Sequence, residues 1–346
     1  MEQRKAYIKG ITTYLPEKRL TNEELAKTYS DWNVEKIYQK TGISERAIAA
    51  TGETAGDLAF MAAEKLFNNG ICKKEEIEFL LLCTQSPDYF LPTTACILQD
   101  RLGLPTSCGA LDFNLGCSGY IYGLSIAKGL IETGMVRNVV LVTSETYSKY
   151  IHPSDRSVRT IFGDGSAATF IASIDSEKDY IGPFVFGTDG ARFEQLIVRS
   201  GGHRTPFSPK SAEDEPPFDN SYCPDQYLTM DGPEIFNFTL EVVPKTVKEL
   251  LNKSGKTMDD INMFVFHQAN KFMLERLRNK MKIPEGRFCI NNEHYGNTVS
   301  ATIPMALEIE IKKGSLQNDN TVLLVGFGVG LSWGATLVKI FFGRSN

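Results

Sequence analysis

The chain has 346 residues, of which 42% are hydrophobic and 23% are charged, and its formal net charge is −5. This length exceeds one ordinary hydrophobic core, so we expect two domains or two similar lobes. The negative charge and the dispersed Lys and Arg residues argue against nucleic-acid binding. No apolar stretch reaches the ~18 residues of a membrane span, so none is expected.

The seven cysteines and four histidines form no metal-binding pattern. There is no C-x-x-C pair, and no two histidines have the H-x-x-x-H spacing of a helical metal site. An odd number of unpaired cysteines is typical of reduced thiols rather than of a disulfide framework. We therefore expect a cytoplasmic protein without a metal site.

In the first half, strand patterns alternate with helix patterns. Thr21 and Glu24 have the spacing of a capping box and predict a helix that begins there. A second helix is predicted over 54–67. Strands are predicted at 7–14, 77–83, 138–143 and 167–172, and the short continuous apolar runs among them are typical of strands buried on both faces. The alternation indicates an α/β sheet that is covered on both sides.

The stretch 111–120 contains Cys117 between Gly116 and Gly119, followed by a segment that is apolar on nearly every face. A helix of that kind is buried, so Cys117 is expected at the N-terminus of a central helix. Free N–H groups there favour a thiolate, which would make Cys117 a nucleophile. A buried structural cysteine explains this stretch equally well.

The second half repeats the pattern of the first. Residues 262–268 can be aligned with 79–85, and residues 321–325 with 138–142, both at an offset of 183. Two matches with one offset predict a duplicated α/β domain, with halves at 1–173 and 174–346. The buried helix after Cys117 then has a counterpart over 298–307, directly after Asn297.

Polar features follow the predicted strands of the second half. His267 ends one strand, and a glycine-rich loop over 326–334 follows another. That loop could bind phosphate or supply N–H groups to an oxyanion, and its spacing is neither that of a P-loop nor that of a dinucleotide fingerprint. Taken alone, His267 is explained as a satisfied buried histidine and Asn297 as a cap or turn residue. The proline-rich stretch 203–218 is predicted to be a surface loop, either a binding loop or disordered.

Together these motifs resemble the thiolase-fold condensing enzymes, most closely the ketoacyl-ACP synthase III family, over nearly the whole chain. The motifs lie at 115–119, 155–156, 161–165, 227–232, 267–270, 295–298 and 326–334. The resemblance implies a thiolase-like five-layered αβαβα fold of two similar halves, and a homodimer. The family uses a cysteine, a histidine and an asparagine, which match Cys117, His267 and Asn297.

The resemblance further implies a two-stage reaction without a cofactor. Cys117 would take the acyl group of an acyl-CoA primer, with the backbone N–H groups of Cys117 and Val329 stabilising the oxyanion. Malonyl bound to acyl carrier protein would then lose CO2, with His267 and Asn297 donating to its thioester carbonyl. The product would be β-ketoacyl-ACP, in fatty-acid or related specialised acyl or polyketide biosynthesis.

The chain departs from the family pattern around the substrate-binding regions. Val329 replaces the middle glycine of a run of three. Trp32, Arg156 and Lys40 match positions that bind coenzyme A, although Lys40 replaces an arginine and ordinary packing also explains Trp32. Lys271 is the candidate for docking the carrier.

The acyl pocket would include Leu91, contributed across the dimer, and the resemblance leaves the primer open. Three alternatives to condensation also remain at this point. They are an acyltransferase that uses the same acyl-cysteine without decarboxylation, a thioester hydrolase, and a non-catalytic partner subunit.

Overall fold

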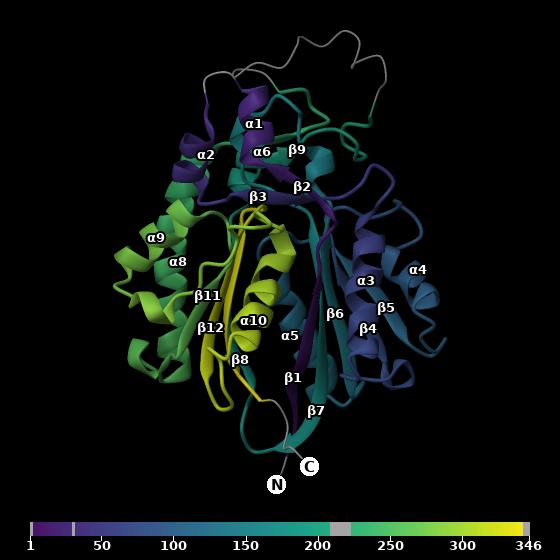
Figure 1. The fold of residues 1–346 in the computed structure, drawn as a ribbon. Helices are drawn as coiled ribbons and strands as arrows, with labels where there is room; N and C mark the ends of the chain where they lie inside the picture. The colour runs from purple at the N-terminus through teal and green to yellow at the C-terminus, as the bar shows by residue number, and fades with distance from the viewer. Residues whose placement is uncertain (1–2, 30–31, 208–222, 342–346) are drawn as a thin grey trace.

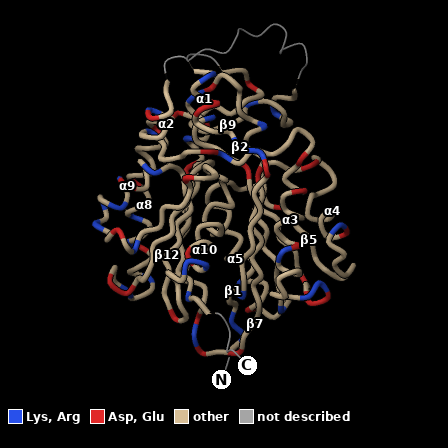
Figure 2. The backbone as a smooth tube through the Cα atoms, viewed as in Figure 1, with Lys and Arg blue, Asp and Glu red and all other residues tan. Residues whose placement is uncertain are grey.

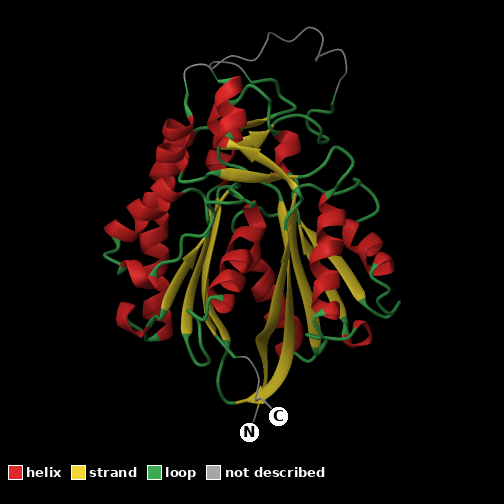
Figure 3. Ribbon diagram, viewed as in Figure 1, coloured by secondary structure: helices red, strands yellow, loops and turns green. Residues whose placement is uncertain are grey.

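The structure is a computed structural model that describes residues 3–29, 32–207 and 223–341. Two sheets and the helices around them form five layers (Figures 1 and 3). Helices α5 (Gly119–Glu132) and α10 (Thr302–Lys312) lie between the sheets. Helices α3 (Ala55–Asn68) and α4 (Thr94–Arg101) cover one outer face, and α8 (Gly232–Ser254) and α9 (Lys271–Lys280) cover the other. The expected five-layered αβαβα architecture is confirmed.

The first sheet has five strands in the order β1-β7-β6-β4-β5. Its central strand β6 pairs parallel with β4 and antiparallel with β7, and β4 also pairs parallel with β5. The apolar runs predicted as strands form β4 and β6, where burial on both faces explains their continuous hydrophobicity. The bounds are β1 (Gln3–Tyr14), β4 (Phe79–Cys83), β5 (Gly109–Phe113), β6 (Asn138–Glu145) and β7 (Gly165–Ser176).

The second sheet has the order β11-β12-β13-β8, and β11 pairs parallel with β12. Its strands are β8 (Ile181–Thr188), β11 (Met263–Phe266), β12 (Thr321–Gly328) and β13 (Ser332–Lys339). Strands β6 and β12 begin and end 183 residues apart, and α5 and α10 begin 183 residues apart. The chain passes from the first sheet to the second between β7 and β8, whereas residue 173 lies inside β7. The division into halves at residue 173 stays a prediction.

The remaining short elements lie mainly at the upper end of the sheets in Figure 1. They are β2 (Lys18–Thr21), α1 (Asn22–Thr28), α2 (Val34–Thr41), β3 (Glu45–Ile48), α6 (Arg156–Arg159), β9 (Leu196–Val198) and β10 (Leu228–Met230). Short 3₁₀ helices lie at Lys74–Glu76, Tyr147–Tyr150, Gly190–Gln195, Met258–Asp260, Glu285–Arg287 and Val299–Ala301. Most of the predicted loop at 203–218 lies outside the described residues.

Several helix ends predicted from the sequence are found in the structure, and two differ. The capping box of Thr21 and Glu24 is formed and starts α1. Helix α5, however, begins two residues after Cys117, and α10 begins five residues after Asn297. The second delay has a physical cause, since Val299 has a left-handed φ of 56°, which an α-helix does not accommodate.

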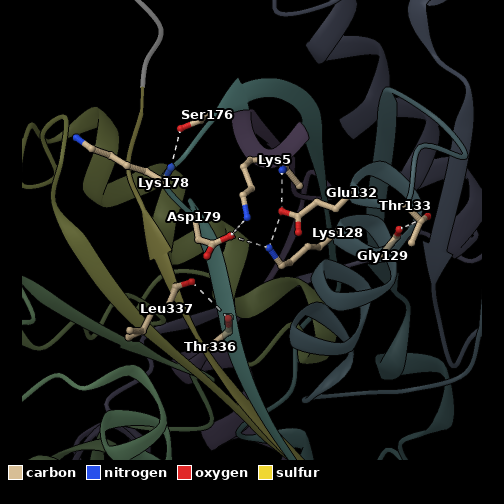
Figure 4. Close-up of polar contacts among 11 residues, drawn as sticks. Lys5, Lys128, Gly129, Glu132, Thr133, Ser176, Lys178, Asp179, Thr336 and Leu337 are labelled. Carbon is tan, nitrogen blue, oxygen red and sulfur yellow. Dashed lines mark hydrogen bonds and ion pairs between the residues drawn. The ribbon is translucent and has the colours of Figure 1, made fainter. Parts of the chain in front are cut away.

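Charged residues lie mostly on the outer helices and loops, while the strands inside the layers contain few (Figure 2). One cluster joins β1 and α5 to the connection between β7 and β8 (Figure 4). There Lys5 Nζ lies 2.8 Å from Asp179 Oδ1, and Lys128 Nζ lies 2.5 Å from Glu132 Oε1 and 3.4 Å from Asp179 Oδ1. Each partly exposed pair stabilises the fold by about 0.2–1 kcal/mol. Within the described ranges, no helix is long and apolar enough to cross a membrane.

Candidate active site

Cys117 lies just before α5, between the two sheets, and its side chain is almost fully buried. The end of β12 approaches it so closely that only glycine fits. A Cβ atom on Gly328 would lie 2.7 Å from Cys117 Sγ, and one on Gly326 would lie 2.7 Å from the Cys117 carbonyl oxygen. The glycine-rich motif therefore brings a strand of the second sheet against the sulfur atom.

The electrostatics of Cys117 differ from the sequence-based expectation. Burial raises the pKa of its thiol to about 12, and the nearby backbone N–H groups of Val329 and Cys117 only partly oppose this shift. The position before a helix was expected to favour the thiolate, but the cost of burying the charge dominates. Cys117 therefore rests as a thiol, and the Val329 N–H group is directed at its sulfur.

His267 directly follows β11, where its backbone N–H donates to the Val325 carbonyl at 2.8 Å. Its ring is buried, and burial lowers the pKa of the imidazole to about 3, although the Val299 carbonyl opposes the shift. His267 is therefore neutral near pH 7. Its Nδ1 atom lies 2.7 Å from Thr302 Oγ1, at the start of α10.

Asn297 is held by both halves of the chain. Its backbone N–H donates to the Ile161 carbonyl at 2.9 Å, and its carbonyl accepts from Gly163 N–H at 3.0 Å. Its side-chain Oδ1 accepts from Val299 N–H at 2.9 Å, which orients the amide. The Nδ2 atom consequently points at His267 Nε2, 3.5 Å away.

The three polar side chains Cys117, His267 and Asn297 line one cavity of about 300 Å³. The rest of its wall is largely apolar and includes Ile161, Phe162, Leu196, Met230, Ile235, Phe236, Phe272, Met273 and Phe327. The structure thus brings together the three residues predicted to be catalytic, from elements far apart in the chain. Such a site combines a nucleophile with two polar groups in surroundings that exclude water.

A second cavity of about 470 Å³ is lined by Val329 and shares Leu196 with the first. It is more polar, because Gln85, Asn114 and Tyr147 line it. Gln85 Nε2 donates to Asn114 Oδ1 at 3.0 Å, and the Tyr147 hydroxyl donates to Gln85 Oε1. Sequence reasoning missed this group, although Gln85 follows β4 as Gln268 follows β11, at the same offset of 183.

Sequence reasoning also missed Glu145, a fully buried carboxyl at the end of β6. Its oxygens accept from Gln85 N–H at 3.0 Å, Ser86 Oγ at 3.2 Å and Ser300 Oγ at 2.9 Å. Burial raises the pKa of Glu145 to about 8. This carboxyl joins the strand end of the first half to the turn that follows Asn297.

The residues predicted to bind coenzyme A lie together around the ring of Trp32. Lys40 Nζ lies 4.5 Å from the centre of the Trp32 ring, and the Arg156 guanidinium lies 5.6 Å from it. Lys36 Nζ also lies over this ring, at 5.6 Å. The cluster presents an aromatic face and positive charge, and its role in coenzyme A binding stays a prediction.

The two remaining candidates occupy different surroundings. Leu91 is 87% exposed, next to Tyr89 at 63% and Phe90 at 80%, and it is not among the residues that line either cavity. Lys271 begins α9 and packs against Gly42, where an added Cβ would lie 2.3 Å from the Lys271 Cβ. Among the described residues, no group of three His, Cys, Asp or Glu side chains could hold a metal ion.

Comparison with known proteins agrees with this geometry. Residues 111–190 match the sequence model of 3-oxoacyl-[acyl-carrier-protein] synthase III, and residues 251–340 match that of its C-terminal part. A β-ketoacyl-[acyl-carrier-protein] synthase III of Caldanaerobacter subterraneus subsp. tengcongensis is 37% identical over 334 residues, which cover 96% of this chain and 97% of the relative.

Solved structures agree over nearly the whole chain. A crystal structure of a 3-oxoacyl-(acyl-carrier-protein) synthase III is 53% identical and superposes with a TM-score of 0.95, covering 97% of this chain and 100% of that one. The 3-oxoacyl-(acyl-carrier protein) synthase of Burkholderia xenovorans LB400 is 37% identical, with a TM-score of 0.89 and coverage of 99% and 96%. The chain therefore belongs to the β-ketoacyl-ACP synthase III family of thiolase-fold condensing enzymes.

Proposed function

We propose that this protein catalyses the decarboxylative condensation of an acyl-CoA primer with malonyl-ACP, as an acyltransferase of EC class 2.3.1. The observation that carries the proposal is the meeting of Cys117, His267 and Asn297 in one largely apolar cavity. The products are β-ketoacyl-ACP, free coenzyme A and CO2, and no cofactor takes part.

In the first stage, Cys117 Sγ attacks the thioester carbonyl of the acyl-CoA. Because the pKa of the buried thiol is about 12, its proton leaves only as the S–C bond forms, and the departing coenzyme A thiolate takes up a proton. The backbone N–H groups of Cys117 and Val329 donate to the oxyanion. Two such donors in a dry site stabilise charge where it develops.

In the second stage, the malonyl carboxylate leaves as CO2 and its bonding electrons move toward the thioester oxygen. His267 and Asn297 donate to that oxygen, and each is expected to contribute ~10²–10³-fold to the rate. Neutral His267 suits this role, since its pKa of about 3 leaves it uncharged. The carbanion then attacks the acyl-Cys117 carbonyl, the C–S bond breaks, and the released thiolate takes up a proton from solvent water.

Binding partners follow from the surface features around the site. Trp32, Lys40 and Arg156 would hold the adenine and phosphates of coenzyme A by stacking and charge. Lys271, at the start of α9, would dock the acidic carrier protein. The exposed Leu91 would enter the acyl pocket of a second copy in a homodimer. All seven cysteines are free thiols, which fits a cytoplasmic enzyme.

The test is a two-stage assay on purified protein. Intact mass after incubation with a graded series of acyl-CoA thioesters should show one acyl group on Cys117. Adding malonyl-ACP labelled at its free carboxyl should then release labelled CO2 and a product two carbons longer than the primer. Cys117→Ala should lose both stages, whereas Cys96→Ala, at an exposed cysteine in α4, should retain both.

Other outcomes would overturn the proposal in recognisable ways. An acylated acceptor without the two-carbon gain would indicate an acyltransferase that does not decarboxylate. Rapid loss of the acyl label without any acceptor would indicate a hydrolase. Failure of Cys117 to take an acyl group from any thioester of the series would indicate a non-catalytic subunit.

A further inference from the structure

The Thr302 hydroxyl lies behind the ring of His267 and has two possible acceptors. Thr302 is the first residue of α10 and is fully buried. Its Oγ1 atom lies 2.7 Å from His267 Nδ1 and 3.0 Å from the Val299 carbonyl oxygen. A hydroxyl has one proton, so it can donate fully to only one of these two atoms.

The choice of acceptor fixes the tautomer of His267. If the hydroxyl donates to the Val299 carbonyl, then Nδ1 must carry the ring proton and Nε2 is a bare acceptor. If the hydroxyl donates to Nδ1, the single proton of the neutral ring lies on Nε2. The ring is neutral in both cases because burial lowers its pKa to about 3.

The two tautomers predict different hydrogen bonding between the side chains of His267 and Asn297. Its Oδ1 accepts from Val299 N–H, so its Nδ2 must face His267 Nε2. A bare Nε2 would accept from Nδ2, and the two side chains would satisfy each other. A protonated Nε2 leaves two N–H groups directed at one space. The observed separation of 3.5 Å exceeds the usual length of an N–H···N bond, which agrees with two donors that are not bonded to each other.

We propose that Thr302 is a positioning residue that donates to His267 Nδ1 and thereby keeps the ring proton on Nε2. His267 and Asn297 then present two N–H groups to a single oxygen atom instead of hydrogen-bonding to each other. The inference rests on the proposed function, in which that oxygen belongs to the malonyl thioester. The Val299 carbonyl is the competing partner, because it lies within reach of the ring and could accept from Nδ1–H.

The experiment compares Thr302→Val, which has the same shape without a hydroxyl, with Thr302→Ser, which keeps the hydroxyl. Thr246→Val is the matched control, because Thr246 is also buried and its hydroxyl donates within α8, to the Val242 carbonyl at 2.9 Å. Labelling histidine with ¹⁵N gives only four imidazoles to resolve by NMR. The nitrogen shifts report which ring atom of His267 carries the proton.

The wild type, Thr302→Ser and Thr246→Val should show His267 protonated on Nε2, whereas Thr302→Val should show it protonated on Nδ1. In the two-stage assay, Thr302→Val should acylate Cys117 within about twofold of the wild-type rate and release CO2 ~10- to 100-fold more slowly. A purely structural role would instead lower both stages together. The same tautomer in the wild type and Thr302→Val would overturn the inference.

The two proposals fail in distinguishable ways. A wild type that acylates Cys117 but releases no CO2 from malonyl-ACP overturns the proposed function, and the NMR comparison still decides the role of Thr302. A wild type that condenses normally, with Thr302→Val releasing CO2 at the same rate, overturns the role of Thr302 alone.

Discussion

The backbone N–H group of Val329 is directed at Cys117, and Val329 also lines the larger and more polar of the two cavities. Its Cγ1 atom would lie 2.6 Å from a Cβ added to Gly116, the residue before Cys117. The side chain therefore narrows the space beside the sulfur, while its backbone N–H group remains available to an oxyanion. Side-chain volume at this position should restrict the acyl group.

Replacing Val329 with Ala should widen acceptance of longer primers. We expect kcat/KM for hexanoyl-CoA relative to acetyl-CoA to rise ~10-fold, since each methylene accommodated in an apolar pocket contributes about 1–3 kcal/mol. Val329→Ile, which adds a methyl group, should shift the ratio in the opposite direction. Steady-state kinetics with the graded acyl-CoA series measures both, and unchanged ratios in the two variants would contradict this role.

Glu145 should make stability depend on pH. Its folded-state pKa of about 8 lies above the value of about 4.5 expected in the unfolded chain, so the folded protein binds the extra proton between these values. The stabilisation is complete below about pH 4.5 and is lost as pH rises through 8. The uncharged Glu145→Gln variant lacks this dependence, and its amide can donate to Ser300 Oγ.

The measurement is the free energy of unfolding by urea, for wild type and Glu145→Gln, from pH 4.5 to 9. The wild type should lose several kcal/mol relative to the variant, in line with about 1.4 kcal/mol per unit of pKa shift. The lowered pKa of His267 gives the opposite slope below pH 6.5 in both proteins, so their difference isolates Glu145. Parallel curves would show that Glu145 is not buried as a proton-binding group.

At the residue scale, the sequence contains the main chemical groups of the site but not their electrostatics. The motifs around Cys117, His267 and Asn297 select these residues, and the structure places them in one cavity. The raised pKa of Cys117 could not be predicted, because it depends on how completely the surrounding layers exclude water. Thr302 and Glu145 lie in no motif with a chemical signature, and only the fold brings them beside the site.

At the scale of elements, the distance between α5 and β4 depends on one glycine. A Cβ atom on Gly119 would lie 2.3 Å from Cys83 Sγ, and Cys83 donates to the Leu115 carbonyl at 2.8 Å. Any side chain at the start of α5 would push the helix, and Cys117 with it, away from the first sheet.

Gly119→Ala should destabilise the protein by about 1–3 kcal/mol because of this overlap. Combining it with Cys83→Ala removes the sulfur atom, so the double variant should lose less stability than the sum of the two single changes. Urea unfolding measures the coupling. Gly129→Ala is the control in the same helix, since nothing lies within 4 Å of its added Cβ, and it should be stabilising by about 0.5–1 kcal/mol. If the stability changes of Gly119→Ala and Cys83→Ala simply add, the contact between the Cys83 sulfur and the added Cβ does not cause the destabilisation.

The central strands of both sheets and the two buried helices could be predicted from the sequence, whereas many of the surrounding helices and strands were not predicted. The apolar runs that became β4, β6, β11 and β12 have no other stable location than a covered sheet. Strand β5 was missed because residues 109–113 mix Gly, Ala and Asp with apolar residues, and only pairing with β4 makes them a strand. The turn at Val299–Ala301 was missed because a β-branched residue with positive φ is disfavoured locally and is held by tertiary contacts.

At the scale of the whole molecule, Tyr89, Phe90 and Leu91 form a run of exposed apolar side chains beside the polar cavity. Exposed apolar patches of this kind mark interaction surfaces. Phe90→Asp should therefore dissociate the proposed homodimer into monomers of 38.5 kDa. Light scattering during size-exclusion chromatography measures this mass over a dilution series.

Met135→Asp, at an exposed methionine after α5, controls for the general effect of removing an apolar surface group and should remain a dimer. A Phe90→Asp protein that keeps the dimer mass at every dilution would place the subunit contact elsewhere.

The offset of 183 residues between corresponding elements, β6 with β12 and α5 with α10, also bears on the evolution of the chain. It is what duplication and fusion of a gene for one such unit, followed by divergence of the copies, would produce. The position equivalent to Cys117 is Ser300, whose hydroxyl donates to Glu145 rather than facing the cavity of the nucleophile. In the proposed reaction, the first half supplies Cys117 and the second half supplies His267 and Asn297, a division of roles that two identical ancestral units could not have had.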